Sequence, residues 1–190
     1  MKKIIPVLVF LFMFSGISYG QLDISFMAGV NSSDFRPDPS QYVVMNDWGY
    51  QAGVHFRVGE KTYFETGAQW LQSRNEFRSN VSCIVGSDEI RVTQVRIPAY
   101  IGRRMICLGV VDLRVNTGPT IRIVTDVLEN NCNIDKEFFT DAAWSWDFGA
   151  GLDVLVFSVD VNYEVGINNF IPSLESTQND ILSITVGLTF

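Results

Sequence analysis

The sequence is poor in cysteine, histidine and basic residues. Its 190 residues include three Cys and one His, and 14 Lys and Arg stand against 21 Asp and Glu. The wide spacing of Cys83, Cys107 and Cys132 excludes a Cys-based metal motif and a dense disulfide framework. The acidic balance disfavours nucleic acid, whose phosphates are bound by clustered Lys and Arg. We therefore expect no nucleic-acid partner, and no motif predicts a cofactor.

Long apolar runs are also scarce. An apolar stretch at 4–14 follows Lys2 and Lys3, and the small residues Ser18 and Gly20 come after it. This stretch is too short to span a bilayer as a helix, and the pattern is that of a cleaved secretory signal peptide. We predict a signal peptide over 1–20 and one mature domain over 21–190. No later segment reaches the run of about 18 apolar residues that a transmembrane helix needs.

Alternation of apolar with polar residues is what the sequence has in abundance. In the last ten residues, every second side chain is large and apolar up to the terminal Phe190. A period of two indicates a β-strand, and about ten residues suffice for a tilted strand to cross a bilayer. Comparable segments are predicted at 22–30, 48–58, 62–72, 92–104, 110–124, 143–154, 157–168 and 181–190.

The predicted connections alternate between short turns and long loops. A tight turn, 59–61, joins the second and third strands, whereas 105–111 is apolar and gives no clear turn signal. The long links are 31–47, 73–91, 125–141 and 168–180. Short turns at one end and long loops at the other are typical of outer-membrane barrels. We predict an all-β, eight-stranded, antiparallel, up-and-down transmembrane β-barrel in the bacterial outer membrane.

Two further patterns favour this fold over a soluble β-protein. In the predicted topology all four tryptophans lie near the loop end, as expected of an aromatic belt at a membrane interface; they are Trp48, Trp70, Trp144 and Trp146. Charged residues alternate with the apolar ones, and they would pair as a lumenal charge network. The network residues are Asp23, Arg57, Glu65, Arg96, Arg114, Arg122, Asp147, Asp153, Asp160 and Glu164. Eight strands leave room only for side chains, so we expect no open pore.

Four segments resemble the small outer-membrane barrels common in Bacteroidota, the PorT-like relatives of the OmpA membrane domain. They are 95–100 (VRIPAY), 116–119 (NTGP), 147–151 (DFGAG) and 160–169 (DVNYEVGINN). The resemblance covers essentially all of 21–190, although Arg96 replaces a residue that is often acidic in the family. It implies that the barrel-assembly machinery recognises the last strand with its terminal Phe190. Most members have no assigned activity, and the secretion role of a few is not carried over.

Three candidate sites remain open at this stage. Cys83 and Cys132 fall in long loops at the same end, so a disulfide is one alternative and two free thiols the other. Cys107 lies at the opposite end and is left over. His55, the single histidine, points to the lumen, and a lipid-modifying enzyme is the sharper alternative to a hydrogen-bonded lumenal His. No Ser and acid stand out as its partners, so we predict no catalytic site and no metal site.

The long loops carry most of the information about partners. Within the four spans above, 13 acidic residues stand against five basic ones. An acidic outer surface can bind divalent cations that bridge it to lipopolysaccharide, or it can simply keep the surface soluble. We predict a non-enzymatic structural or surface-interaction protein whose partners are outer-membrane lipid, lipopolysaccharide and an unidentified protein at the loops. The alternatives are a narrow channel or transporter, a secretion-associated component and a lipid-modifying barrel enzyme.

Overall fold

The computed structural model describes residues 22–36, 43–46, 48–78, 88–128, 140, 142–169 and 178–190. These residues form β1 (Leu22–Arg36), β2 (Val43–Asn46), β3 (Trp48–Val58), β4 (Thr62–Arg78), β5 (Asp88–Cys107), β6 (Val111–Leu128), β7 (Ala142–Val154), β8 (Phe157–Gly166) and β9 (Gln178–Thr189). Within them, no helix has the length and apolar character needed to cross a membrane. The predicted signal peptide lies outside the described residues and stays a prediction.

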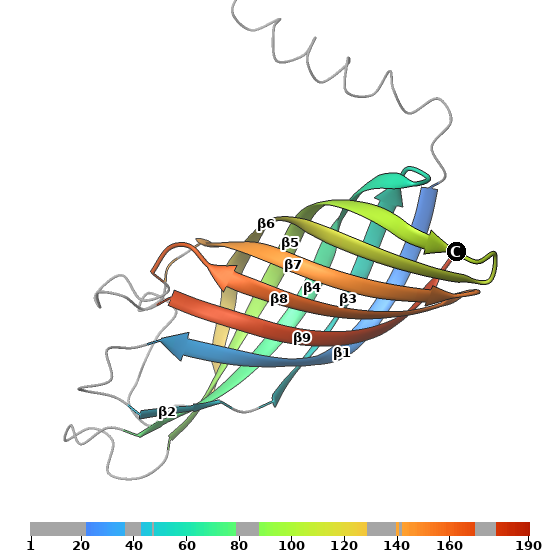
Figure 1. Cartoon of the computed structure of the whole chain (residues 1–190). Helices are drawn as coiled ribbons and strands as arrows, with labels where there is room; N and C mark the ends of the chain where they lie inside the picture. Colours follow the sequence, from blue (N-terminus) through green and yellow to red (C-terminus); the bar gives the residue numbers. More distant parts are fainter. Residues whose placement is uncertain are drawn as a thin grey trace, which may run out of the picture.

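Eight of these strands close into an antiparallel barrel. From β3 to β9 each strand pairs with the next, β1 pairs with both β3 and β9, and every pairing is antiparallel. The short β2 adds only to the outer part of β4, beyond the end of β3. Figure 1 shows β1 beside β9, with the C-terminus at the end of the barrel that carries the short turns. The predicted eight-stranded up-and-down barrel is confirmed.

The pairing register fixes how steeply the strands tilt. One row of paired residues starts at Thr62 on β4 and runs through Arg103, Val115, Ala150, Val161, Ile184, Val30 and Tyr50. It returns to β4 at Gln72, ten residues nearer the loop end than Thr62. A stagger of this size tilts the strands by roughly 35–45° to the barrel axis. Each such row therefore climbs toward the loop end as it passes from β5 to β8.

Several strands are longer than the sequence pattern predicts, and this corrects the loop boundaries. β1 continues to Arg36 and β4 to Arg78, while β5 already begins at Asp88. Part of each predicted long link is therefore paired backbone, and β2 lies inside the predicted link 31–47. Backbone pairing does not require an apolar outward face once the strands rise above the hydrocarbon, so alternation alone underestimates their length.

The turns at the other end are short, and each of the three contains a residue with a positive φ. Gly109 has a φ of 80° and closes the β5–β6 hairpin within the apolar segment that gave no turn signal. Leu155 has a φ of 56°, in the left-handed region that non-glycine residues rarely adopt. It lies in the two-residue turn 155–156 between β7 and β8. Gly59, with a φ of 127°, opens the polar turn 59–61.

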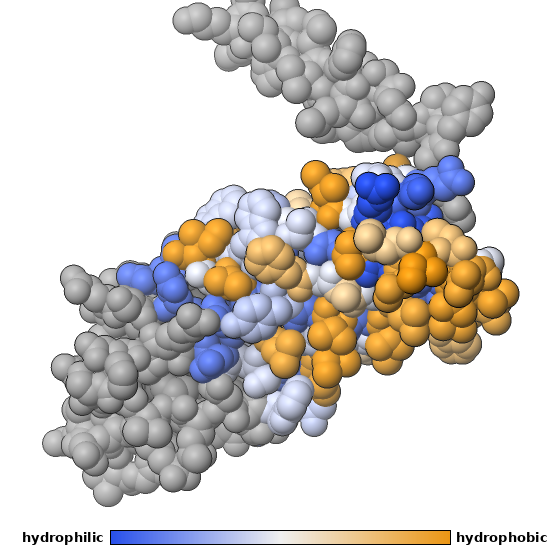
Figure 2. All heavy atoms as spheres, in the orientation of Figure 1, coloured by the Kyte–Doolittle hydropathy of each residue, from blue (hydrophilic) through white to orange (hydrophobic). Residues whose placement is uncertain are grey.

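The barrel is apolar outside and polar inside. On β7, Phe148 is 55% exposed on the outer wall, whereas the neighbouring Asp147 is 0% exposed in the lumen. Figure 2 shows apolar residues covering much of the visible wall and gathering at the turn end, with hydrophilic residues near the start of β1. This is the reverse of a soluble barrel, and only a hydrocarbon environment covers such a wall.

Candidate functional site

The lumen is filled by five arginines and the carboxylates that surround them. Arg57, Arg96, Arg114 and Arg122 are at most 2% exposed, and Arg104 is mostly buried near the turn end. Each lies on the inward face of β3, β5 or β6, where the two-residue period places every second side chain in the lumen. All ten residues of the predicted charge network lie on this inner face. Arg104 belongs with them, although the sequence reasoning missed it.

The half of the lumen nearest the turns is a dense cluster of ion pairs. Arg57 binds Glu65 (Nε–Oε2, 3.0 Å) and Asp153 (Nη1–Oδ2, 3.3 Å). Arg114 binds Asp153 (Nε–Oδ2, 2.9 Å) and Asp160 (Nη2–Oδ1, 2.6 Å). The guanidinium groups are thus shared between carboxylates that belong to β4, β7 and β8. This cross-linking ties opposite walls of the barrel together.

Arg104 extends the same cluster to the barrel mouth. Its Nη2 lies 2.6 Å from Asp23 Oδ2, and its Nε lies 3.8 Å from Asp112 Oδ2. Nη1 of Arg104 also donates to the carbonyl of Glu60 in the β3–β4 turn, at 2.6 Å. Arginine makes these contacts together because its guanidinium carries five donors in one plane. The side chain therefore links the β3–β4 turn to the first residues of β1 and β6.

A second cluster lies nearer the loop end and centres on Glu164. Its Oε2 is 3.2 Å from Arg96 Nη1, and its Oε1 is 2.6 Å from Arg122 Nε. Ser145 donates to the same Oε1 at 2.5 Å. Asp147 accepts instead from the Tyr100 hydroxyl at 2.9 Å. Every one of these groups is at most 1% exposed, so the loss of any partner would leave a buried polar group unsatisfied.

His55 connects the two clusters through both of its ring nitrogens. Nδ1 lies 2.6 Å from Glu65 Oε1, and Nε2 lies 2.6 Å from Gln69 Nε2. Arg96 Nε donates to Gln69 Oε1 at 2.7 Å, which turns the Gln69 amide group toward the ring. His55 Nε2 must accept this bond, so we assign the neutral tautomer with its proton on Nδ1. An acid partner, Glu65, thus exists where sequence reasoning saw none, but Gln69 occupies the position a nucleophile would need.

Glycines make room for these large side chains. At Gly151 an added Cβ would meet Asp160 Oδ1 and the guanidinium of Arg114. At Gly102 it would collide with the ring of Tyr63. The Cζ atom of Arg57 lies over this ring, 5.0 Å from the ring centroid. Both close approaches need a residue without a side chain. The arginines could not cross the lumen at these heights with larger residues opposite them.

An apolar layer separates the Glu164 cluster from the outer mouth. On five strands, the inward residue just beyond a polar lumenal residue is apolar and at most 2% exposed; these residues are Leu71, Val92, Val124, Ala143 and Ile181. The side chains of this layer carry no charged group to attract an ion. These apolar residues occupy positions that the alternation assigns to the polar inner face, so the sequence pattern does not predict an apolar layer there.

The remaining predicted residues lie on the wall, at its ends or outside the described part. The four predicted belt tryptophans are 42–51% exposed on the outer wall. Phe190 is exposed beside β1, where its backbone exchanges two hydrogen bonds with Ile24. Cys107 is an exposed free thiol in β5, whereas Cys83 and Cys132 lie outside the described residues. Among the described residues, no His, Cys, Asp or Glu cluster is arranged to hold a metal ion.

The comparisons with known proteins agree on the fold. Residues 14–172 match the family model described as an outer membrane protein beta-barrel domain. No curated protein sequence matches the chain significantly. Similar solved structures include the outer membrane protein OprG from Pseudomonas aeruginosa, with 14% identity over 90% of this chain and 97% of that one, at a TM-score of 0.57. Neisserial surface protein A has 10% identity over 91% and 100% of the two chains, at a TM-score of 0.56.

A third similar structure was solved with a ligand. It is Ail, the attachment invasion locus protein of Yersinia pestis, in complex with the heparin analogue sucrose octasulfate. Its identity to this chain is 16% over 90% of this chain and 99% of that one, at a TM-score of 0.50. At these identities the similarity supports the barrel architecture and assigns no ligand.

Proposed function

The chain belongs to the outer-membrane β-barrel family and lies in the bacterial outer membrane, and from this premise we propose that it is a non-enzymatic structural or surface-interaction protein acting through its outer loops. The filled lumen carries the proposal. Four arginines at most 2% exposed cross it, and an apolar layer lies above them. With the interior occupied, only the wall and the two ends remain available to partners.

The loop end is built as a platform for such contacts. β1, β4, β5 and β6 contain 15 to 20 residues each, more than the 9–11 that a tilted strand needs to cross a bilayer. Their outer parts therefore stand above the hydrocarbon as paired sheet, and β2 widens this sheet on β4. Binding residues are often loop residues carried by such a rigid scaffold.

The charge of the loops favours one class of partner. The predicted long links hold 13 acidic and five basic residues. Carboxylates bind divalent cations through oxygen ligands, and these cations also bind the phosphates of lipopolysaccharide. A sulfated polyanion of the kind bound to Ail would meet repulsion at these loops. We therefore propose lipopolysaccharide, bridged by Ca²⁺ or Mg²⁺, as a surface partner, together with an unidentified protein.

Lipopolysaccharide binding can be tested directly on the folded protein. We expect purified barrel in nanodiscs to bind lipopolysaccharide in the presence of Ca²⁺ and to release it on chelation. Asp126→Asn, on the outer part of β6, should weaken binding, whereas Lys61→Ala at the opposite end should not. Binding that is unchanged by chelation would overturn the bridging proposal.

A channel is the second candidate, and planar bilayers decide between the two. Among the described residues, buried side-chain atoms of Asn116, Asn162 and Thr185 have no hydrogen-bond partner, and this is the observation that favours a hydrated track on one side of the lumen. The apolar layer argues against ion passage. We expect no conductance from the native barrel. Steady conductance from the native protein would favour the channel.

We also propose that the chain is one of the PorT-like small barrels of Bacteroidota. The four segments that carry the resemblance fall on β5, β6, β7 and β8, which are consecutive neighbours in the wall. They contain Arg96, Asp147, Asp160 and Glu164 of the lumenal clusters. Shared motifs at these positions are expected if relatives hold their lumen together in the same way. A relative of known structure that keeps all four motifs but whose counterpart of Glu164 binds no lumenal arginine would count against this proposal.

A further inference from the structure

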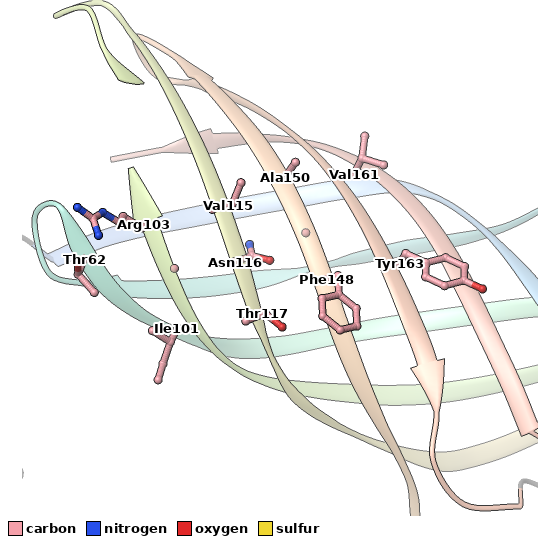
Figure 3. A pocket seen from close by; sticks show the side chains of 12 residues that line it. Thr62, Ile101, Arg103, Val115, Asn116, Thr117, Phe148, Ala150, Val161 and Tyr163 are labelled. Atoms are coloured by element: carbon pink, nitrogen blue, oxygen red, sulfur yellow. The ribbon is translucent and has the colours of Figure 1, made fainter. Parts of the chain in front are cut away.

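An apolar groove with one arginine at its end runs across the outer wall of β5 to β8. It has a volume of about 660 Å³. Ile101, Phe148 and Tyr163 line it with large side chains, and the smaller side chains of Thr117 and Ala150 leave the space between them. Figure 3 shows Thr62 and Arg103 at one end of the groove and Tyr163 at the other. We propose that this groove binds a glycerophospholipid of the inner leaflet, with its phosphate at Arg103 and an acyl chain along the groove.

Arg103 is placed at the depth of a headgroup. It pairs with Thr62, the first residue of β4 after the polar turn 59–61, in which Glu60 and Lys61 are exposed. Its own side chain is exposed on the lipid-facing wall, and among the described residues no carboxylate pairs with it. A lone arginine on this face is costly at the bilayer centre but tolerated at the interface. There, the natural counter-ion of a guanidinium is a lipid phosphate, which it binds with two parallel hydrogen bonds.

The course of the groove fits one leaflet. Arg103, Val115, Ala150 and Val161 are consecutive partners in one row of the register. Given the stagger, the row rises by about one and a quarter residues per strand, so Val161 lies roughly 10 Å nearer the loop end than Arg103. Tyr163, two residues further, lies roughly 15 Å above it. Half of the apolar band of an outer-membrane barrel is about 12 Å, so the groove has the length of one leaflet's acyl chains.

A second groove on the wall provides an internal control. It has a similar volume of about 700 Å³ and is lined by Phe26, Ala28, Ala52, Val54 and Phe157, among others. No charged residue lines it. Acyl chains pass over both grooves, but only the first offers a partner for a phosphate. Specific retention of a phospholipid is therefore expected at the first groove and not at the second.

Native mass spectrometry of the detergent-solubilised barrel tests the site, with dioleoyl phosphatidylglycerol as the probe. We expect one retained phospholipid per barrel. Arg103→Ala should weaken retention about fivefold, the effect expected of one basic side chain at a lipid surface. Ala150→Trp should remove it by filling the groove. The matched controls Lys61→Ala, an exposed charge outside the groove, and Ala52→Trp, in the second groove, should retain the lipid as the native barrel does.

Each contrary result overturns the proposal. Retention unchanged in both Arg103→Ala and Ala150→Trp would mean that the groove binds nothing specific. Equal retention of dioleoylglycerol, which lacks the phosphate, would remove the role of Arg103, and full competition by inorganic phosphate would indicate an anion site rather than a lipid site. Heat-dependent migration on a gel verifies that each variant is folded, and Arg103→Gln and Ala150→Leu replace any variant that is not. Loss of lipopolysaccharide binding at the loops would not change the expected retention of phospholipid in this groove.

Discussion

Replacement of Glu164 by Gln should destabilise the barrel strongly, because this carboxylate neutralises two buried arginines. Its oxygens lie 3.2 Å from Arg96 Nη1 and 2.6 Å from Arg122 Nε, and all three side chains are at most 1% exposed. Gln has nearly the same volume, so packing is preserved while the negative charge is lost. Breaking a buried ion pair from one side costs about 3–5 kcal/mol. We expect a loss in that range in the free energy of unfolding.

Two further variants separate the charge effect from a general sensitivity of the barrel. Asp112→Asn removes a carboxylate that is 31% exposed and 3.8 Å from Arg104, and such a pair is worth less than about 1 kcal/mol. The triple variant Arg96→Met, Arg122→Met and Glu164→Leu removes both charges and counter-charge together. Apolar replacement of a whole buried cluster is often neutral. We therefore expect the triple variant to be more stable than Glu164→Gln alone.

The assay is urea unfolding of the protein refolded into lipid vesicles, followed by tryptophan fluorescence. All four tryptophans lie on the lipid-facing wall, so their emission reports loss of the bilayer environment. The folded fraction on an unboiled gel gives a second measure of the same transition. The reasoning is refuted if Glu164→Gln unfolds within 1 kcal/mol of the native barrel, or if it is no less stable than Asp112→Asn.

Further predictions concern single residues at other places in the barrel. Deletion of Phe190 should reduce assembly in cells and leave refolding in vitro nearly intact, and equal loss in both would contradict a recognition role. Oxidised protein should migrate faster than reduced protein if Cys83 and Cys132 are bonded, with a stabilisation of about 3 kcal/mol; identical migration indicates free thiols. Leu155→Gly should stabilise by about 1 kcal/mol in urea unfolding by relieving the left-handed backbone. His55→Ala should cost about 1–3 kcal/mol and leave lipid A chemically unchanged by mass spectrometry, and altered lipid A would favour an enzyme.

The barrel itself could be predicted because a membrane imposes a simple rule on the sequence. Outward residues within the bilayer are mostly apolar, so the alternation around Phe148 or Val161 is regular enough to place β7 and β8 within two residues. Where the strands leave the bilayer, the rule no longer applies. The sequence pattern therefore predicts loops for the outer parts of β1 and β4, although their backbones pair as regularly as those below.

The interior was predictable as a set of residues and not as an arrangement. The alternation placed Arg96 and Glu164 on the inner face, but it could not say which carboxylate each arginine binds. That depends on the stagger of the strands, which a single sequence does not reveal. The contact of His55 with Gln69 is an example, since its geometry follows from a third residue, Arg96, on another strand. Arg104 shares the inward face of β5 with Arg96, but the two consecutive arginines Arg103 and Arg104 interrupt the alternation at the end of the strand, so the pattern does not say which of them faces the lumen.

Functional residues on this fold are best sought where an outward-facing residue is polar or charged instead of apolar. Polar side chains occur on the wall, but Thr66 and Thr117 donate to the backbone carbonyls of Pro98 and Asp147 at 2.8 Å. Thr117 also accepts from the indole of Trp146 at 2.8 Å. These groups are satisfied by the barrel and need nothing from the membrane. Among the residues that the structure describes, Arg103 has no such internal partner, so its charge directs attention to what lies outside the wall and to the groove beside it.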